Sequence, residues 1–162
     1  MIDYLDKFKD DPATTVVREN GEAATELSFR FELDWGPDGW HKGDHYTNAD
    51  PQPYVLSGHL DRVVSYNDDL FVMDRKTTTT TPSQYYMDQY SPNNQMTLYT
   101  LAGQVVLGAS IKGVIIDAAQ VLLEKPNNYV RGFTYRTHDQ LNEWLNDLRF
   151  WFRSAENYAP LS

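Results

Sequence analysis

The stretch DLFVMDRKTTTTT, residues 69–81, ends an apolar run with an acidic residue and two basic residues. In a β-strand, successive side chains point to opposite faces, so Asp74 and Lys76 would share one face. A carboxylate can hold a hard divalent cation, and a neighbouring ammonium group can polarise a water or stabilise charge on a phosphate. The alternative is a solvent-facing strand on which charged residues merely alternate with buried ones. The spacing alone leaves both interpretations open.

A second carboxylate is predicted to lie opposite Asp74. Residues 54–76 read as two strands joined by a tight turn at YNDD, because Asn and Asp tolerate turn geometry. The numbers of cross-strand partners then sum to 135, which sets Asp61 opposite Asp74 and His59 opposite Lys76. Directly opposed carboxylates repel each other, and a bound cation would offset that repulsion. A register shift of one residue would remove the pairing.

The elements around these residues must position them. TELSFRFEL alternates with period two and predicts a half-buried strand over residues 25–33. The segment 91–108 predicts a helix with Ser91 as N-cap, Pro92 at the first helical position and Gly108 as the stop.

The other expected elements are a short helix or irregular lead-in over residues 1–20, a turn-rich loop over 34–53, one or two largely buried strands over 111–123 and a helix over 137–159. Asp117 is expected to end an apolar strand and to cap a turn there. Together these elements predict an α/β or α+β fold for residues 1–162, a single domain with a central mixed β-sheet flanked by helices.

Composition excludes several classes of protein. The 162 residues suit one domain, and 41% of them are apolar, as in folded globular proteins. The chain lacks a signal peptide and a run of about 18 apolar residues, so we expect a soluble, cytoplasmic protein. It has no cysteine, which excludes disulfides and thiolate metal sites. A net charge of -9 argues against coating nucleic acid by bulk attraction, but residues 51–162 contribute only -2 of it.

Three segments in order, SGHLDRVV, LFVMDRKTT and QMTLY, resemble the Gly-x-x-Asp, Asp-x-Lys and Gln-x-x-x-Tyr motifs of RecB-like nucleases in the PD-(D/E)XK superfamily. TELSFRFEL resembles the preceding strand of phage members, and the resemblance covers roughly residues 24–157. It implies a restriction-endonuclease-like core and a Mg²⁺- or Mn²⁺-dependent deoxyribonuclease of the exonuclease type, acting in a bacterial host cell. DNA, and recombination or replication proteins, are the implied partners.

The same resemblance implies roles for single residues. Asp61 and Asp74 would hold the metal with the backbone carbonyl of Arg75, and Lys76 would be the catalytic lysine. Hydrolysis would then use a metal-activated water.

Four further residues are weaker candidates, each with an ordinary alternative. Gln95 and Tyr99 would orient the site or contact DNA, or else be polar positions on an amphipathic helix. Glu26 could add a third carboxylate, or be an exposed strand acid. His59 could approach the metal, or be a hydrogen-bonded structural histidine.

The chain departs from the RecB-like pattern in two ways. Many of these enzymes add a histidine ligand from an upstream helix, and some bind an iron-sulfur cluster through C-terminal cysteines. This sequence has no cysteine and begins close to its first strand, so we expect the core of a longer enzyme or a minimal one. A nuclease-fold module that binds DNA or a partner without turnover is the alternative function.

Overall fold

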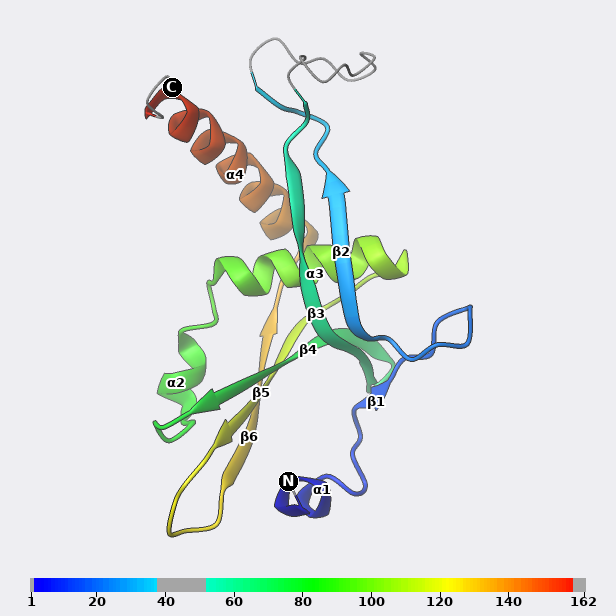
Figure 1. The fold of residues 1–162 in the computed structure, drawn as a ribbon, viewed down its shortest axis with the longest axis vertical. Coiled ribbons are helices and arrows are strands. Elements are labelled where there is room, and N and C mark those ends of the chain that lie inside the picture. The colour runs from blue at the N-terminus through cyan, green and yellow to red at the C-terminus, as the bar shows by residue number, and fades with distance from the viewer. Residues whose placement is uncertain (1, 38–51, 159–162) are drawn as a thin grey trace. The chain divides into compact units, whose positions relative to one another are not determined.

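A computed structural model describes residues 2–37 and 52–158. These residues form two compact units (Figure 1), of which the first comprises residues 2–27 and 59–137 and the second residues 28–37, 52–58 and 138–158. Most of the expected loop over 34–53 lies outside the described residues. Among the described helices, none is both long enough and apolar enough to cross a membrane.

The helices and strands, in chain order, are α1 (Ile2–Lys7), β1 (Thr14–Thr15), β2 (Thr25–Glu32), β3 (Val55–Tyr66), β4 (Asp69–Thr78), α2 (Gln84–Asp88), α3 (Asn94–Leu107), β5 (Gly113–Gln120), β6 (Asn128–Tyr135) and α4 (His138–Tyr158). The strands form one sheet in the order β1-β3-β4-β5-β6, with β2 also paired to β3. The β4–β5 pair is parallel, whereas β1–β3, β3–β4 and β5–β6 are antiparallel. The predicted mixed sheet of an α/β domain is therefore confirmed.

The β3–β4 hairpin has the register predicted from the sequence. Its paired residues run from Tyr66 and Asp69 to Arg62 and Met73, and every pair sums to 135. Both turn residues adopt the left-handed region, with φ of 49° at Asn67 and 65° at Asp68. This geometry is that of a two-residue hairpin turn whose twist matches the flanking strands.

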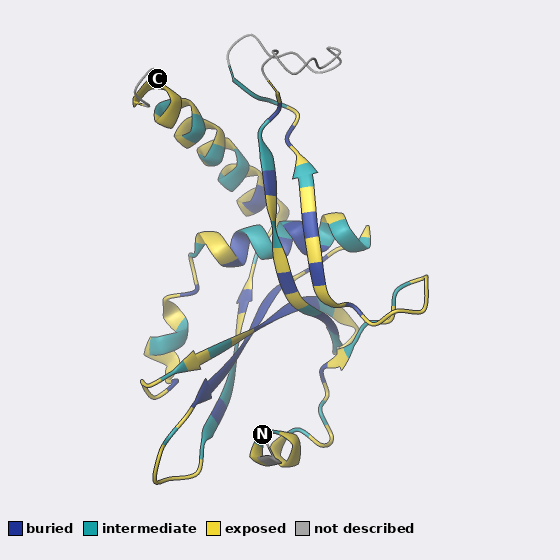
Figure 2. Ribbon diagram, viewed as in Figure 1, coloured by how far each residue is buried: buried dark blue, intermediate teal, exposed yellow. Residues whose placement is uncertain are grey.

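Strand β5 is buried along its whole length, as Figure 2 shows by its continuous dark colour. A parallel pair needs a crossover connection, and residues 79–112, which contain α2 and α3, connect β4 to β5. Helix α3 packs on both strands, and Gly103 lets it approach Val72 and Ile111 closely. The sheet face under α3 therefore forms one side of the core.

Helix α3 ends as predicted but begins later. Gly108 terminates it in the left-handed conformation, with φ of 61°. The N-cap is Asn93, not Ser91, because the Asn93 side chain accepts a hydrogen bond from the Met96 N–H. Asparagine caps a helix as well as serine does, so the composition of SPNN could not decide between them.

Three short elements were not predicted. They are β1, α2 and β6. Strand β6 has only two buried positions among its eight residues, so its sequence lacks a clear alternation of apolar and polar side chains. Gly132 lies in the middle of this strand. A glycine suits this position because the Met87 side chain of α2 occupies the space that a Cβ would need.

The second unit contains an aromatic cluster. Trp35 and Tyr54 pack edge to face with ring centroids 5.3 Å apart, and Phe152 of α4 lies 5.7 Å from Trp35 and 4.8 Å from Tyr54. The Tyr54 hydroxyl also donates a hydrogen bond to Glu156 of α4. These contacts hold α4 within this unit.

Substitution of Gly113 by alanine is expected to destabilise the protein by about 3 kcal/mol or more. A Cβ at Gly113 would overlap the backbone carbonyl oxygen of Thr134 in β6, and backbone cannot move without breaking the β5–β6 pairing. The Gly132→Ala change is the matched control, because it meets only the flexible side chain of Met87. Urea denaturation of both variants measures the difference, and an equal loss for the two would contradict this explanation.

Candidate active site

Asp74 is the buried carboxylate of the site. It lies in β4 and is 4% exposed. Its Oδ2 atom lies 2.9 Å from Lys76 Nζ, yet it is buried without a partner in hydrogen-bond geometry. Burial raises the pKa of Asp74, the charge of Asp61 raises it further, and the contact with Lys76 offsets part of this.

Asp61 lies beside Asp74 on the neighbouring strand. It is exposed on β3, one residue beyond the paired residues Arg62 and Met73. Its Oδ2 accepts a hydrogen bond of 2.8 Å from the backbone N–H of Arg75. The two predicted metal-binding carboxylates are therefore brought together, and the peptide that precedes Lys76 joins them.

Helix α3 contributes the two predicted polar residues. Lys76 Nζ donates to Gln95 Oε1 over 2.8 Å, and Gln95 Nε2 donates to the Tyr99 hydroxyl over 3.1 Å. Burial and the charge of Asp74 raise the pKa of Tyr99, so its hydroxyl keeps its proton at neutral pH. A continuous chain of polar contacts thus runs from Asp74 through Lys76 to the surface of α3.

Arg136 fixes the start of α3, and nothing in the sequence indicated this role. Its guanidinium group donates to the carbonyl oxygens of Tyr90 and Asn93 and to the hydroxyl of Thr97. These acceptors flank Gln95 on both sides. A single arginine after a strand carries no motif, so only the packed structure shows that it holds the segment carrying Gln95.

Glu26 and His59 are placed differently from the main group. Glu26 is exposed, with φ of 49°, and lines a cavity of about 270 Å³ together with Asp61, Arg75 and Asp117. His59 is exposed on β3, two residues before Asp61. The structure thus brings Glu26 to the same cavity as Asp61. The roles predicted for Glu26 and His59 remain predictions.

Asp117 does not cap a turn as predicted. It lies within β5, is 2% exposed, and accepts hydrogen bonds from Tyr4, Arg75 and Arg131. The prediction was wrong because β5 continues for three residues beyond Asp117, and because the partners of its carboxylate lie far away in the sequence.

The threonine run is partly strand. Thr77 and Thr78 extend β4 and pair with β5, whereas the following threonines are exposed and turn away. Thr78 Oγ1 and the backbone of Thr80 bond to each other, and Gln120 Nε2 donates to the Thr79 carbonyl oxygen. The loop is therefore held at the carboxyl end of β4, two residues beyond Lys76.

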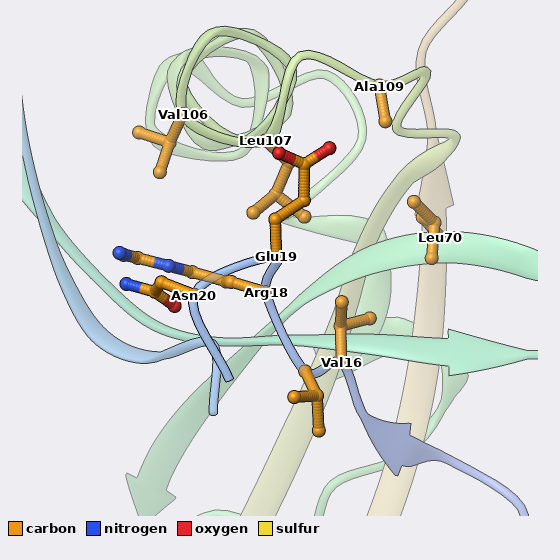
Figure 3. Close-up of a pocket in the computed structure, with 9 residues that line it drawn as sticks. Val16, Arg18, Glu19, Asn20, Leu70, Val106, Leu107 and Ala109 are labelled. Atoms are coloured by element: carbon orange, nitrogen blue, oxygen red, sulfur yellow. The ribbon is translucent and has the colours of Figure 1, made fainter. Parts of the chain in front are cut away.

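A larger cavity of about 440 Å³ lies elsewhere in the first unit (Figure 3). Its apolar wall comes from Val16, Leu70, Val106, Leu107 and Ala109, and its polar rim from Arg18, Glu19 and Asn20. It shares no residue with the cavity beside Asp61. None of the predicted site residues lines it.

The oxygen atoms of the site fit a hard divalent cation. Asp61 and Asp74 supply two carboxylates, and Mg²⁺ is often held by one or two carboxylates plus waters and substrate oxygens. The buried Asp74 Oδ2 has no partner in hydrogen-bond geometry, and its one close cationic neighbour is the Lys76 ammonium group at 2.9 Å, so it retains capacity to bind a cation. In the described ranges, no three His, Asp or Glu side chains converge on one point.

The mixed sheet, its covering helices and the carboxylates and lysine on adjacent strands define a restriction-endonuclease-like α/β protein. The chain belongs to the PD-(D/E)XK nuclease superfamily, whose sequence model matches residues 4–159. Members of this superfamily are generally hydrolytic nucleases, and they typically use divalent metals such as Mg²⁺. A search of curated proteins found no match.

Proposed function

We propose that this protein is a Mg²⁺- or Mn²⁺-dependent deoxyribonuclease of the RecB-like type found in phages and prophages, and that it degrades DNA from an end. One observation carries the proposal: Asp61 and Asp74 adjoin Lys76 on neighbouring strands, and Lys76 is held by Gln95. In this proposal residues 1–162 form one catalytic domain.

The carboxylates have distinct tasks. Asp74 is held inside the sheet, so its position is rigid, whereas Asp61 is exposed and is oriented by the Arg75 N–H. Together with the Arg75 carbonyl they would hold the metal. A bound divalent cation supplies Lewis-acid activation of water and neutralises charge on the phosphate.

Lys76 is the residue that acts on the reacting groups. Gln95 accepts one of its three N–H donors and Asp74 lies against it, so the ammonium group is held at one place. A further N–H can donate to the attacking water or to a phosphate oxygen as negative charge builds there. Tyr99, which keeps its proton, orients Gln95 and can donate to the DNA backbone.

DNA would be gripped locally. The net charge of -9 argues against many contacts between basic side chains and phosphates, so binding should be weak. The exposed threonine hydroxyls at the end of β4 are suited to contact phosphates without adding charge.

A cleavage assay with linear and closed circular DNA tests the proposal. Linear DNA should be degraded in Mg²⁺ or Mn²⁺, closed circles should survive, and a chelator should stop the reaction. Cleavage of closed circles would show an endonuclease instead. No cleavage of single- or double-stranded ends in either metal would overturn the proposal and favour a module that binds DNA or a partner without turnover.

A further inference from the structure

We infer that Tyr4 and Asp117 are positioning residues that act on the proposed active site through Arg75, from the opposite face of the sheet. The inference rests on the proposed function for its catalytic consequence. In the metal-free protein, Tyr4 and Asp117 would fix the position of one group, the backbone N–H of Arg75.

Arg75 connects the two faces of β4. Its neighbours Asp74 and Lys76 project toward Gln95 of α3, so the Arg75 side chain projects to the other face. There its guanidinium group donates to Asp117 Oδ2 over 3.2 Å. Its backbone N–H, meanwhile, donates to the carboxylate of Asp61.

Asp117 is the buried anchor for this side chain. The Cα atoms of Arg75 and Asp117 are partners in the parallel β4–β5 register, so the ion pair joins directly adjacent positions. The same oxygen accepts a hydrogen bond of 2.6 Å from the Tyr4 hydroxyl, and the other oxygen accepts from Arg131 Nε over 3.1 Å. A carboxylate that is 2% exposed and fully hydrogen-bonded has little freedom to move.

Tyr4 of α1 contacts both Arg75 and Asp117. The guanidinium carbon of Arg75 lies 4.2 Å from the centre of the Tyr4 ring, so the ring covers the group while its hydroxyl bonds Asp117. Helix α1 has its own attachments to the sheet, since Lys7 Nζ donates to the Tyr129 carbonyl oxygen. Loss of the Tyr4 hydroxyl alone should therefore leave α1 in place.

The segment that carries Tyr4 is also held by Asp11. Its carboxylate accepts two hydrogen bonds from Arg131, of 2.6 and 2.8 Å. Arg131 also donates to the Tyr4 hydroxyl over 3.2 Å. The Tyr4 hydroxyl is thus fixed by groups on both sides of it before it reaches Asp117.

These contacts have a consequence for the metal ligands. Active-site residues must be held within about 0.5 Å of their productive positions. Removing a residue that hydrogen-bonds to a metal ligand typically lowers metal affinity by about 10- to 100-fold. The Arg75 peptide orients Asp61 through its N–H, and its carbonyl is a proposed ligand. If the Arg75 side chain were held less firmly, this peptide could rotate. Rotation would weaken both the hydrogen bond to Asp61 and the proposed metal contact of the Arg75 carbonyl.

The Tyr4→Phe variant tests the inference, with Tyr129→Phe as the matched control on the same sheet face. The Tyr129 hydroxyl bonds only to Asn127 among the described residues, so its loss should not reach Arg75. The backbone amide of Arg75 is followed by NMR in the metal-free protein. We expect its proton resonance to shift upfield and its exchange with solvent to accelerate about tenfold in Tyr4→Phe, and to stay unchanged in Tyr129→Phe.

Metal binding provides the second measurement. The Mn²⁺ concentration for half-saturation, measured by electron paramagnetic resonance, should rise about tenfold in Tyr4→Phe, with kcat at saturating Mn²⁺ nearly retained. If Tyr4→Phe proves unstable, an Arg75→Gln variant should show the same faster solvent exchange at the backbone amide of residue 75. Unchanged exchange of this amide in both variants would overturn the inference. Absence of Mn²⁺ binding by the wild-type protein would instead overturn the proposed function, while the amide measurement still decides the inference.

Discussion

An Asp74→Asn variant should lose metal-dependent DNA cleavage by about 10³-fold or more and, without metal, be more stable than the wild-type protein at neutral pH. The two effects share one cause. Burial of the Asp74 charge, which its contact with Lys76 offsets only in part, destabilises the metal-free fold but suits a cation. We expect a gain of about 1–2 kcal/mol in the free energy of unfolding.

The dependence of this gain on pH follows from the raised pKa of Asp74. Because the folded protein binds this proton more tightly than the unfolded chain does, wild-type stability improves as the pH falls through the folded-state pKa. The asparagine variant lacks this response. Its advantage should therefore be largest at neutral pH and shrink toward zero below the ordinary aspartate pKa of about 3.9.

Asp69→Asn is the matched control, since Asp69 lies on the same strand but its carboxylate is 52% exposed. Thermal denaturation of the three proteins between acid and neutral pH gives the comparison. If Asp74→Asn destabilised the metal-free protein at neutral pH while Asp69→Asn did not, the carboxylate would be a structural residue and not a strained metal ligand. Mn²⁺ should stabilise the wild-type protein and not the Asp74→Asn variant.

Replacement of Lys76 by methionine should reduce the cleavage rate by about 10²- to 10³-fold, with metal binding retained. Methionine keeps the length of the side chain but removes the charge and the donors that reach Gln95. The affinity for Mn²⁺ should rise, because the Lys76 ammonium group lies 2.9 Å from Asp74 Oδ2 and repels a second cation.

Lys112→Met is the control for this change. Lys112 is half-exposed and pairs with Asp69 at 3.9 Å, at the far end of the hairpin from Lys76. Single-turnover cleavage and Mn²⁺ titration of both variants separate chemistry from binding. A Lys76→Met protein that cleaved at the wild-type rate would show that the lysine serves the fold and not the reaction.

The sequence predicted the hairpin well because its information is local. Two adjacent residues suited to positive φ, Asn67 and Asp68, lie between strand-like segments and define the register over about twenty residues. Gly108 was likewise predicted from a local signal as the end of α3. Local signals did not show whether Asn93 or Ser91 begins the helix. Both are good caps, and only the packed helix shows which one is used.

The motif order predicted Gln95 and Tyr99 as members of the site by resemblance, but the contact of Gln95 with Lys76 required α3 to pack on β4. Nothing in the sequence indicated that Arg136 would hydrogen-bond to the start of α3. Each of these contacts joins segments separated by dozens of residues, where no period or spacing rule applies.

By itself, therefore, the sequence determined the β3–β4 register and the shared face of Asp74 and Lys76, because the turn residues set the first and the two-residue period of a strand sets the second. The tertiary structure alone decided what lies behind that site. It placed Asp117 beside Arg75 through a parallel pairing across 42 residues, and it brought Tyr4 onto them from the start of the chain. Parallel register depends on a crossover connection and on packing of the whole sheet, which no local pattern encodes.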